Sequence, residues 1–162
     1  MSKKETKTNA MRILDQNHIS YQIHTYDVSD DMIDGVSVAM KCGEDPEQVF
    51  KTLVTVGNDK NHYVFVIPVA EKLDLKECAK AVGVKNVEMI PQKELLGLTG
   101  YIHGGCSPIG MKKKFETVFD ETIVLFDEIM VSGGRVGTQV EVSVEDLIRI
   151  TDGKVKAITR TS

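Results

Sequence analysis

The 162-residue sequence has no tryptophan, only four prolines and only three cysteines. The cysteines Cys42, Cys78 and Cys106 are odd in number, far apart and without a CxxC pair, which argues against a disulfide framework and against structural zinc. The longest apolar run, residues 63–69, is too short to span a bilayer. The N-terminus also lacks the apolar segment of a secretory signal. These absences predict a cytoplasmic protein with free thiols and no membrane partner.

An excess of positive charge is also absent, because the formal net charge is −4 and the isoelectric point is near 5.6. Tight unaided binding of nucleic acid usually needs a broad basic face, so we expect no DNA partner. The one dense cationic run, residues 112–114, is either a solvated surface or a local phosphate contact. A nucleic acid remains a possible substrate if only its end is read or if a partner holds the rest.

Short strand-like segments alternate with short helical ones, without regular βαβ repetition. This order indicates a single α+β domain over residues 9–160, preceded by a disordered segment 1–8. We expect about 6–8 strands in one mixed, curved or barrel-like sheet, with helices packed around it. The alternation at residues 19–26 predicts a half-buried strand. Its two faces would carry Ile19, Tyr21 and Ile23 on one side and Gln22, His24 and Tyr26 on the other.

Two glycine-rich loops are the strongest local signals. Residues 100–110 (GYIHGGCSPIG) hold four glycines and a proline directly before the cationic run, and residues 132–137 (SGGRVG) repeat the theme. Glycine permits positive φ and close backbone approach, so such a loop can turn its backbone N–H groups toward an anionic or carbonyl oxygen. Alternatively, the second loop only connects the two strands of a hairpin, since a strand-like segment follows it.

Lys51 is the most informative single residue, because it interrupts the strand-like apolar segment 49–56. On a half-buried strand a lysine usually faces water. The alternative places its ammonium inside a concave sheet, where it would bind a phosphate, ribose hydroxyl or carbonyl oxygen. Thr52 beside it would add a hydroxyl group.

His103 and Cys106 form an H-x-x-C pair that would resemble a nucleophile and its base if the side chains met. The sequence offers no clear third group to orient them, so we disfavour catalysis by this cysteine. Two ligands are also too few for zinc, and we predict neither a metal nor a cofactor. The G-x-S-x-G elbow, the P-loop and the dinucleotide fingerprint are all absent.

Three motifs in order, VFKTL at residues 49–53, GYIHGGCSPIG at 100–110 and VSGGRVG at 131–137, resemble those of the YbaK/EbsC family. Members of this family are freestanding relatives of the editing domain of bacterial prolyl-tRNA synthetases. The resemblance extends over nearly the whole chain, including ISYQIHTY at residues 19–26. It is strongest to the YbaK branch, the Cys-tRNA(Pro) deacylases, and it implies the fold of that family.

The resemblance also implies the site. Lys51 would be the key functional residue, with Tyr26 and Ser132 lining the pocket and backbone amides of Gly104 and Gly105 near the aminoacyl carbonyl. The remaining positions are implied only as substrate contacts: Thr52, Ser107, Gly133, Gly134 and Gln139. Gln139 departs from the pattern, since many relatives carry an acidic residue there.

The implied function is removal of cysteine from mischarged Cys-tRNA(Pro), with Cys-tRNA(Cys) as a further substrate. In the route implied by the family, the thiol of the substrate attacks its own ester carbonyl, so the enzyme needs no nucleophile of its own. The partners would be the acceptor end of the tRNA and prolyl-tRNA synthetase, which would supply tRNA selection. Two alternatives stay open, namely hydrolysis of Ala-tRNA(Pro) by water and a non-catalytic module that binds nucleotides or the acceptor end.

Overall fold

The computed structural model describes residues 7–32 and 34–160, and it confirms the α+β prediction. Five α-helices and two short 3-10 helices form over these residues. They are α1 (Asn9–Gln16), α2 (Gly35–Lys41), α3 (Leu75–Val82), η1 (Gln92–Glu94), α4 (Leu95–Thr99), η2 (Glu121–Leu125) and α5 (Val144–Thr151). Helices α1, α2, α3 and α5 each begin at a side chain that accepts a hydrogen bond from the first turn, as N-cap residues do. These caps are Thr8, Asp34, Asp74 and Ser143.

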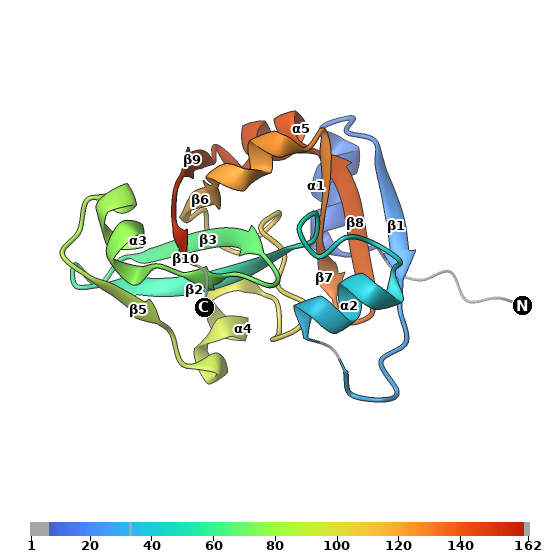
Figure 1. Ribbon diagram of the computed structural model, residues 1–162, viewed down its shortest axis with the longest axis horizontal. Helices are drawn as coiled ribbons and strands as arrows, with labels where there is room; N and C mark the ends of the chain where they lie inside the picture. Colours follow the sequence, from blue (N-terminus) through green and yellow to red (C-terminus); the bar gives the residue numbers. More distant parts are fainter. Residues whose placement is uncertain (1–6, 33, 161–162) are drawn as a thin grey trace, which may run out of the picture.

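The described residues also form ten strands, in three sheets (Figure 1). The strands are β1 (Tyr21–Thr25), β2 (Phe50–Gly57), β3 (His62–Pro68), β4 (Lys72–Leu73), β5 (Val87–Met89), β6 (Glu116–Asp120), β7 (Glu128–Arg135), β8 (Thr138–Ser143), β9 (Lys154–Lys156) and β10 (Thr159–Arg160). The largest sheet has the order β5-β2-β3-β6-β9 and is mixed, since β3–β6 and β6–β9 are parallel. The second has the order β1-β8-β7, and β10 pairs with β4 alone.

The single barrel-like sheet that we expected does not form, because no barrel closes among the described strands. The two larger sheets meet at one parallel bridge between Val49 and Met130, just before β2 begins. That bridge does not continue into a ladder, so β2 and β7 diverge beyond it. The two larger sheets are therefore separate, and both contribute to one apolar core that includes Phe50, Phe119 and Val140.

The strand register agrees with the predicted faces of β1, since Ile23 lies across from Val140 and His24 lies across from Gln139, but Ile23 is 52% exposed. Strand β1 is the edge of its sheet, and helix α2 covers the opposite face from Ile23. Ala39 of α2 packs against Met130, and Met130 lies across from Glu141 in the β7–β8 pair. His24 therefore lies on the covered face, where its side chain is partly buried.

The predicted disorder of residues 1–8 can be compared with the structure only at residues 7 and 8, because residues 1–6 lie outside the described residues. Thr8 is described, and besides capping α1 its hydroxyl donates a 2.5 Å hydrogen bond to the carbonyl of Gly133. Within residues 7–32 and 34–160, no helix has both the length and the apolar character needed to cross a membrane.

Candidate functional site

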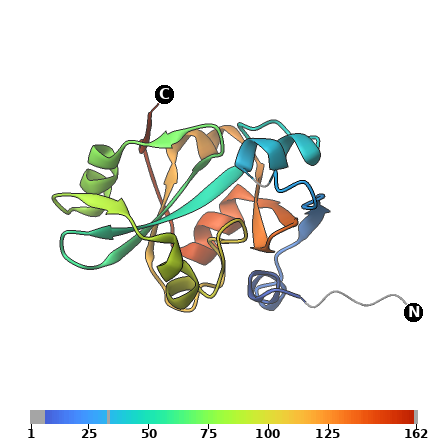
Figure 2. The same ribbon diagram turned by 90° about the horizontal axis from the view of Figure 1, so that it is seen from below.

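A cavity of about 320 Å³ opens where the two larger sheets meet. Its walls come from the end of β1, from α2, from the first half of β2, from the loop that follows α4 and from β7 and β8. Figure 2 shows β2 running between α2 and α4, which both contribute residues to the cavity. Six residues that the sequence predicted for the site line this cavity together: Tyr26, Lys51, Thr52, Gly104, Ser132 and Gln139.

Lys51 is the one lysine or arginine among the residues that line the cavity. It belongs to β2 and lies opposite Ile67 of β3, so ladder pairing with β3 fixes its backbone. The pKa of its ammonium is lowered, first by burial and then by the nearby positive charge of Lys72, while Glu71 opposes the shift. The structure thus favours the inward-facing reading of Lys51, with a cation held in a partly desolvated site.

Two buried polar atoms in the cavity have no hydrogen-bond partner among the described residues. They are the hydroxyl Oγ1 of Thr52 and the amide Oε1 of Gln139. Buried polar groups are paired in the great majority of folded proteins, so unpaired ones mark places where a ligand or water completes the contacts. Gln139 lies between His24 of β1 and Ser132 of β7 in the strand register, and its side chain is held on the cavity face.

The two glycine-rich loops contact each other at Gly105, where the lack of a side chain allows the two backbones to approach closely. A Cβ placed on Gly105 would lie 2.9 Å from the Cα of Arg135 and 2.9 Å from the backbone nitrogen of Val136. The amide of Gly105 donates to the carbonyl of Ile102 at 2.9 Å, so it is engaged inside its own loop. Of the two predicted carbonyl-binding glycines, Gly104 lines the cavity while Gly105 fixes the loop behind it.

Three predicted substrate contacts lie outside the cavity lining. The hydroxyl of Ser107 is buried and accepts a hydrogen bond from the amide of Ile109 at 3.2 Å. Gly134 has φ near +99° and faces Thr8 and Tyr101, and Gly133 accepts the bond from Thr8. These residues shape the loops. Ser132 is the member of its motif that reaches the cavity, where its Oγ accepts from the amide of Gly134.

His103 and Cys106 both line the cavity, so the structure brings this pair into one site. Burial raises the pKa of the Cys106 thiol to about 12, with a small opposing contribution from Thr99. A thiol with such a pKa is almost entirely protonated at neutral pH, and the thiolate is the nucleophile. The raised pKa therefore argues against nucleophilic catalysis by Cys106, although His103 lines the same cavity.

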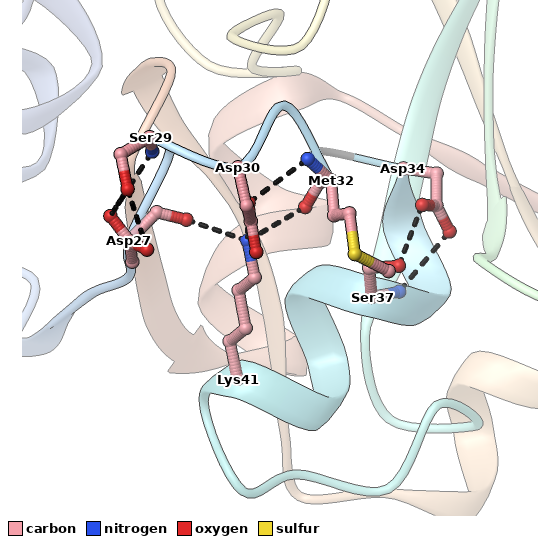
Figure 3. Close-up of polar contacts among 7 residues, drawn as sticks. All are labelled: Asp27, Ser29, Asp30, Met32, Asp34, Ser37 and Lys41. Carbon is pink, nitrogen blue, oxygen red and sulfur yellow. Dashed lines mark hydrogen bonds and ion pairs between the residues drawn. The ribbon is translucent and has the colours of Figure 1, made fainter.

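Sequence reasoning missed the wall made by α2, which brings Asp34, Gly35 and Val38 to the cavity. No local signal could have found them, because their position depends on how α2 packs over the β1–β8 face. Asp34 is the one carboxylate among the lining residues, and it also caps α2 by accepting from the amide and hydroxyl of Ser37 (Figure 3). These hydrogen bonds lower the pKa of its carboxyl group.

Lys41, the last residue of α2, forms hydrogen bonds with the segment that joins β1 to α2 (Figure 3). Its Nζ donates to the carbonyl of Asp27 at 2.7 Å, to Oδ1 of Asp30 at 2.7 Å and to the carbonyl of Met32 at 2.9 Å. The segment lies between Tyr26 and Asp34, which both line the cavity. Lys41 therefore helps to set the distance between two cavity walls without reaching the cavity.

Comparison with known proteins gives a consistent result. A family model described as the aminoacyl-tRNA editing domain matches residues 34–150. A protein of Enterococcus faecalis, provisionally named Cys-tRNA(Pro)/Cys-tRNA(Cys) deacylase EbsC, is 46% identical over 161 residues, which is 98% of each chain.

Two solved structures share the fold. The crystal structure of a hypothetical protein, APE2540, superposes with a TM-score of 0.85 at 21% identity, over 94% of this chain and 99% of the other. The structure of a candidate trans-editing enzyme for prolyl-tRNA synthetase gives 0.81 at 22% identity, over 96% and 99%. At these identities the two structures establish the fold, and the sequence matches establish the family.

Proposed function

The chain belongs to the aminoacyl-tRNA editing domain family, and we propose that it removes cysteine from mischarged Cys-tRNA(Pro), and from Cys-tRNA(Cys) as a further substrate. The observation that carries the proposal is the meeting of Lys51, Tyr26, Gly104 and Ser132 at one cavity from four separate segments. The near full-length similarity to the Enterococcus faecalis protein supports the choice of cysteine. A cavity of about 320 Å³ is at the small end for ligand sites and suits one aminoacyl group with part of the terminal ribose.

An aminoacyl ester is already activated, so the protein has to position it and to stabilise negative charge that develops on the carbonyl oxygen. Lys51 supplies the positive charge in the cavity, and the backbone of Gly104 supplies the nearby polar group. Because Lys51 is partly desolvated, its charge acts more strongly on a bound oxygen than it would in water. Thr52 and Gln139 offer unpaired polar atoms that orient the rest of the substrate.

In the reaction that we propose, the thiol of the bound cysteine loses its proton and its sulfur attacks the ester carbonyl of the same residue. A C–S bond forms, the ester C–O bond breaks, and the 3′-terminal hydroxyl of the tRNA leaves with a proton. The products are a four-membered cyclic thiolactone and free tRNA. This route agrees with a cavity whose own thiol, that of Cys106, has its pKa raised to about 12 by burial.

The negative net charge of the chain bears on how the tRNA is chosen. With a net charge of −4, the protein lacks the means to grip a tRNA strongly through phosphates alone. We therefore propose that prolyl-tRNA synthetase holds the tRNA while this domain reads the aminoacylated end. Strong discrimination for tRNA(Pro) by the isolated protein at physiological salt would refute this division of labour.

The function is tested by measuring release of the amino acid from Cys-, Ala- and Ser-tRNA(Pro) by the wild-type protein, by Lys51→Ala and by the control Lys76→Ala. Lys76 is exposed on α3 and does not line the cavity. We expect rapid release of cysteine only, little release of serine because serine lacks the thiol, and loss of about 100-fold or more in Lys51→Ala alone. Equal activity of the two lysine variants would remove Lys51 from the mechanism.

The same panel separates the alternatives. Release of alanine by the wild-type protein, at a rate equal to that of cysteine, would favour hydrolysis by water as in other branches of the family. Stoichiometric binding of the acceptor end without turnover of any substrate would favour a non-catalytic binding module.

A further inference from the structure

Three side chains that could bind a metal ion meet beside the cavity, from segments that are far apart in the sequence. His24 comes from β1, Glu141 comes from β8, and Glu44 comes from the turn that follows α2. One donor atom from each lies within 4.8 Å of the others, and all three residues are partly buried. The Nε2 atom of His24 lies 2.9 Å from Oε1 of Glu141.

This arrangement brings two carboxylates together in a partly buried place, where like charges repel more strongly than in water. No ion pair among the described residues joins Glu44 or Glu141 to a lysine or an arginine. His24 can offer one positive charge, and only when it is protonated. A divalent cation would balance both carboxylates and leave the imidazole neutral, which is the form in which histidine binds metals.

The donor set is one imidazole nitrogen and two carboxylate oxygens, a combination that suits zinc or a similar first-row divalent ion better than magnesium. Tetrahedral zinc with bonds of about 2.0–2.2 Å would place its donors roughly 3.3–3.6 Å apart. The donors lie within 4.8 Å of one another, so zinc binding would draw some of them closer together and would open the 2.9 Å contact between His24 and Glu141.

A further oxygen donor lies on the same face of the sheet. Gln139 pairs with His24 across the β1–β8 ladder, its side chain is only 7% exposed, and its Oε1 has no hydrogen-bond partner among the described residues. Because Gln139 also lines the cavity, the His24 cluster and the cavity share a neighbour.

We propose that His24, Glu44 and Glu141 form a binding site for a divalent transition-metal ion of the zinc type. The ion ties the turn after α2 to strands β1 and β8, and it thereby holds the α2 wall against the sheet that carries Tyr26 and Gln139. Its role is structural, because none of the three ligands lines the cavity. This site goes beyond the deacylase function, and it would exist whether or not the protein acts on Cys-tRNA.

The test titrates Zn²⁺, Mn²⁺ and Mg²⁺, each as the metal alone, into chelator-treated full-length protein by calorimetry in the absence of tRNA. The variants are Glu44→Gln and the matched control Glu47→Gln, since Glu47 is exposed three residues away and outside the cluster. We expect one Zn²⁺ per chain, weaker binding of Mg²⁺, and a loss on the order of 100-fold in Zn²⁺ affinity for Glu44→Gln alone.

Thermal unfolding of the same samples gives a second readout, because an ion that binds only the folded state raises the midpoint. We expect Zn²⁺ to raise the midpoint of the wild-type protein and of Glu47→Gln, and to leave that of Glu44→Gln nearly unchanged. Absence of saturable Zn²⁺ binding to the wild-type protein would overturn the site. Equal Zn²⁺ affinity in Glu44→Gln would overturn it as well, since it would assign the binding to other residues, such as the cysteines.

Discussion

Replacing Gly105 by alanine tests whether the two glycine-rich loops form one unit. Three backbone atoms of the opposite loop, belonging to Arg135 and Val136, lie within 2.9–3.0 Å of the position that the new Cβ would take. Ordinary contacts of a Cβ with other carbon and nitrogen atoms are near 3.4–4 Å. Because backbone cannot rotate away as a side chain can, one loop must move by about half an ångström or more.

The expected cost follows from this overlap. Overpacking of a closely packed site destabilises proteins by about 1–3 kcal/mol. If the loop shift also breaks the hydrogen bond from Gly105 to Ile102, roughly 1 kcal/mol is added. For a chain of this length each kcal/mol lowers the unfolding midpoint by about 2–4 °C. Gly104 next to the substitution would shift in the cavity, and we expect deacylation of Cys-tRNA(Pro) to fall about 10-fold or more.

Gly97→Ala is the matched control, because nothing lies within 4 Å of a Cβ at Gly97 and the residue is inside helix α4. Alanine is favoured over glycine inside a helix, so this variant should gain about 0.5–1 kcal/mol and keep full activity. Thermal unfolding and deacylation are measured on both variants. If Gly105→Ala is as stable as Gly97→Ala, the close approach of the two loops is wrong. If it is destabilised but fully active while folded, the loop does not belong to the reacting site.

Two further substitutions separate chemistry from positioning. Cys106→Ala should keep its deacylation rate within about two-fold of wild type, because a thiol with its pKa raised to about 12 supplies almost no thiolate; a 100-fold loss would instead make this cysteine catalytic. Lys41→Met keeps most of the side-chain volume but removes three hydrogen bonds to the segment between Tyr26 and Asp34. It should lower the free energy of unfolding by about 1 kcal/mol and raise KM more than it lowers kcat. Unchanged kinetics would show that this segment does not determine the shape of the cavity.

Local signals predicted most of the individual elements. Asp74 and Gly83 are residue types typical of helix N-caps and C-caps, and they cap α3 at its two ends, Gly83 with φ near +74°. Ser143 caps α5 by accepting from the amide of Asp146, as the S-x-x-D spacing predicts. Such signals succeed because capping depends on residues three or four apart, which the sequence places next to each other.

Features that depend on how distant segments pack were not predictable in this way. Ile23 is exposed because β1 is the edge of its sheet, and His24 is partly buried because α2 lies over its face. His103 and Cys106 are too few ligands for a metal, and no residue near them in the sequence completes a ligand set. Glu44 and Glu141 are 97 positions apart, and only the fold brings them to His24. In the same way, the sequence could name Lys51 but could not say which face of β2 it occupies.

The unpaired polar atoms of Thr52 and Gln139 in the cavity indicate that these residues serve ligand binding rather than the stability of the fold. Leaving a buried donor or acceptor unsatisfied costs about 1–3 kcal/mol, so Thr52 and Gln139 lower the stability of the ligand-free protein to the extent that water does not pair with them. Valine and leucine would fill the same positions without that cost, as Val38 and Leu53 do elsewhere in the cavity wall. The partly desolvated ammonium of Lys51 adds to this cost, because burial favours its neutral form. A bound ester would offer hydrogen-bond partners to Thr52 and Gln139 and an oxygen atom to the ammonium of Lys51. Unpaired polar groups that destabilise the free protein would then favour the complex, because binding pairs them.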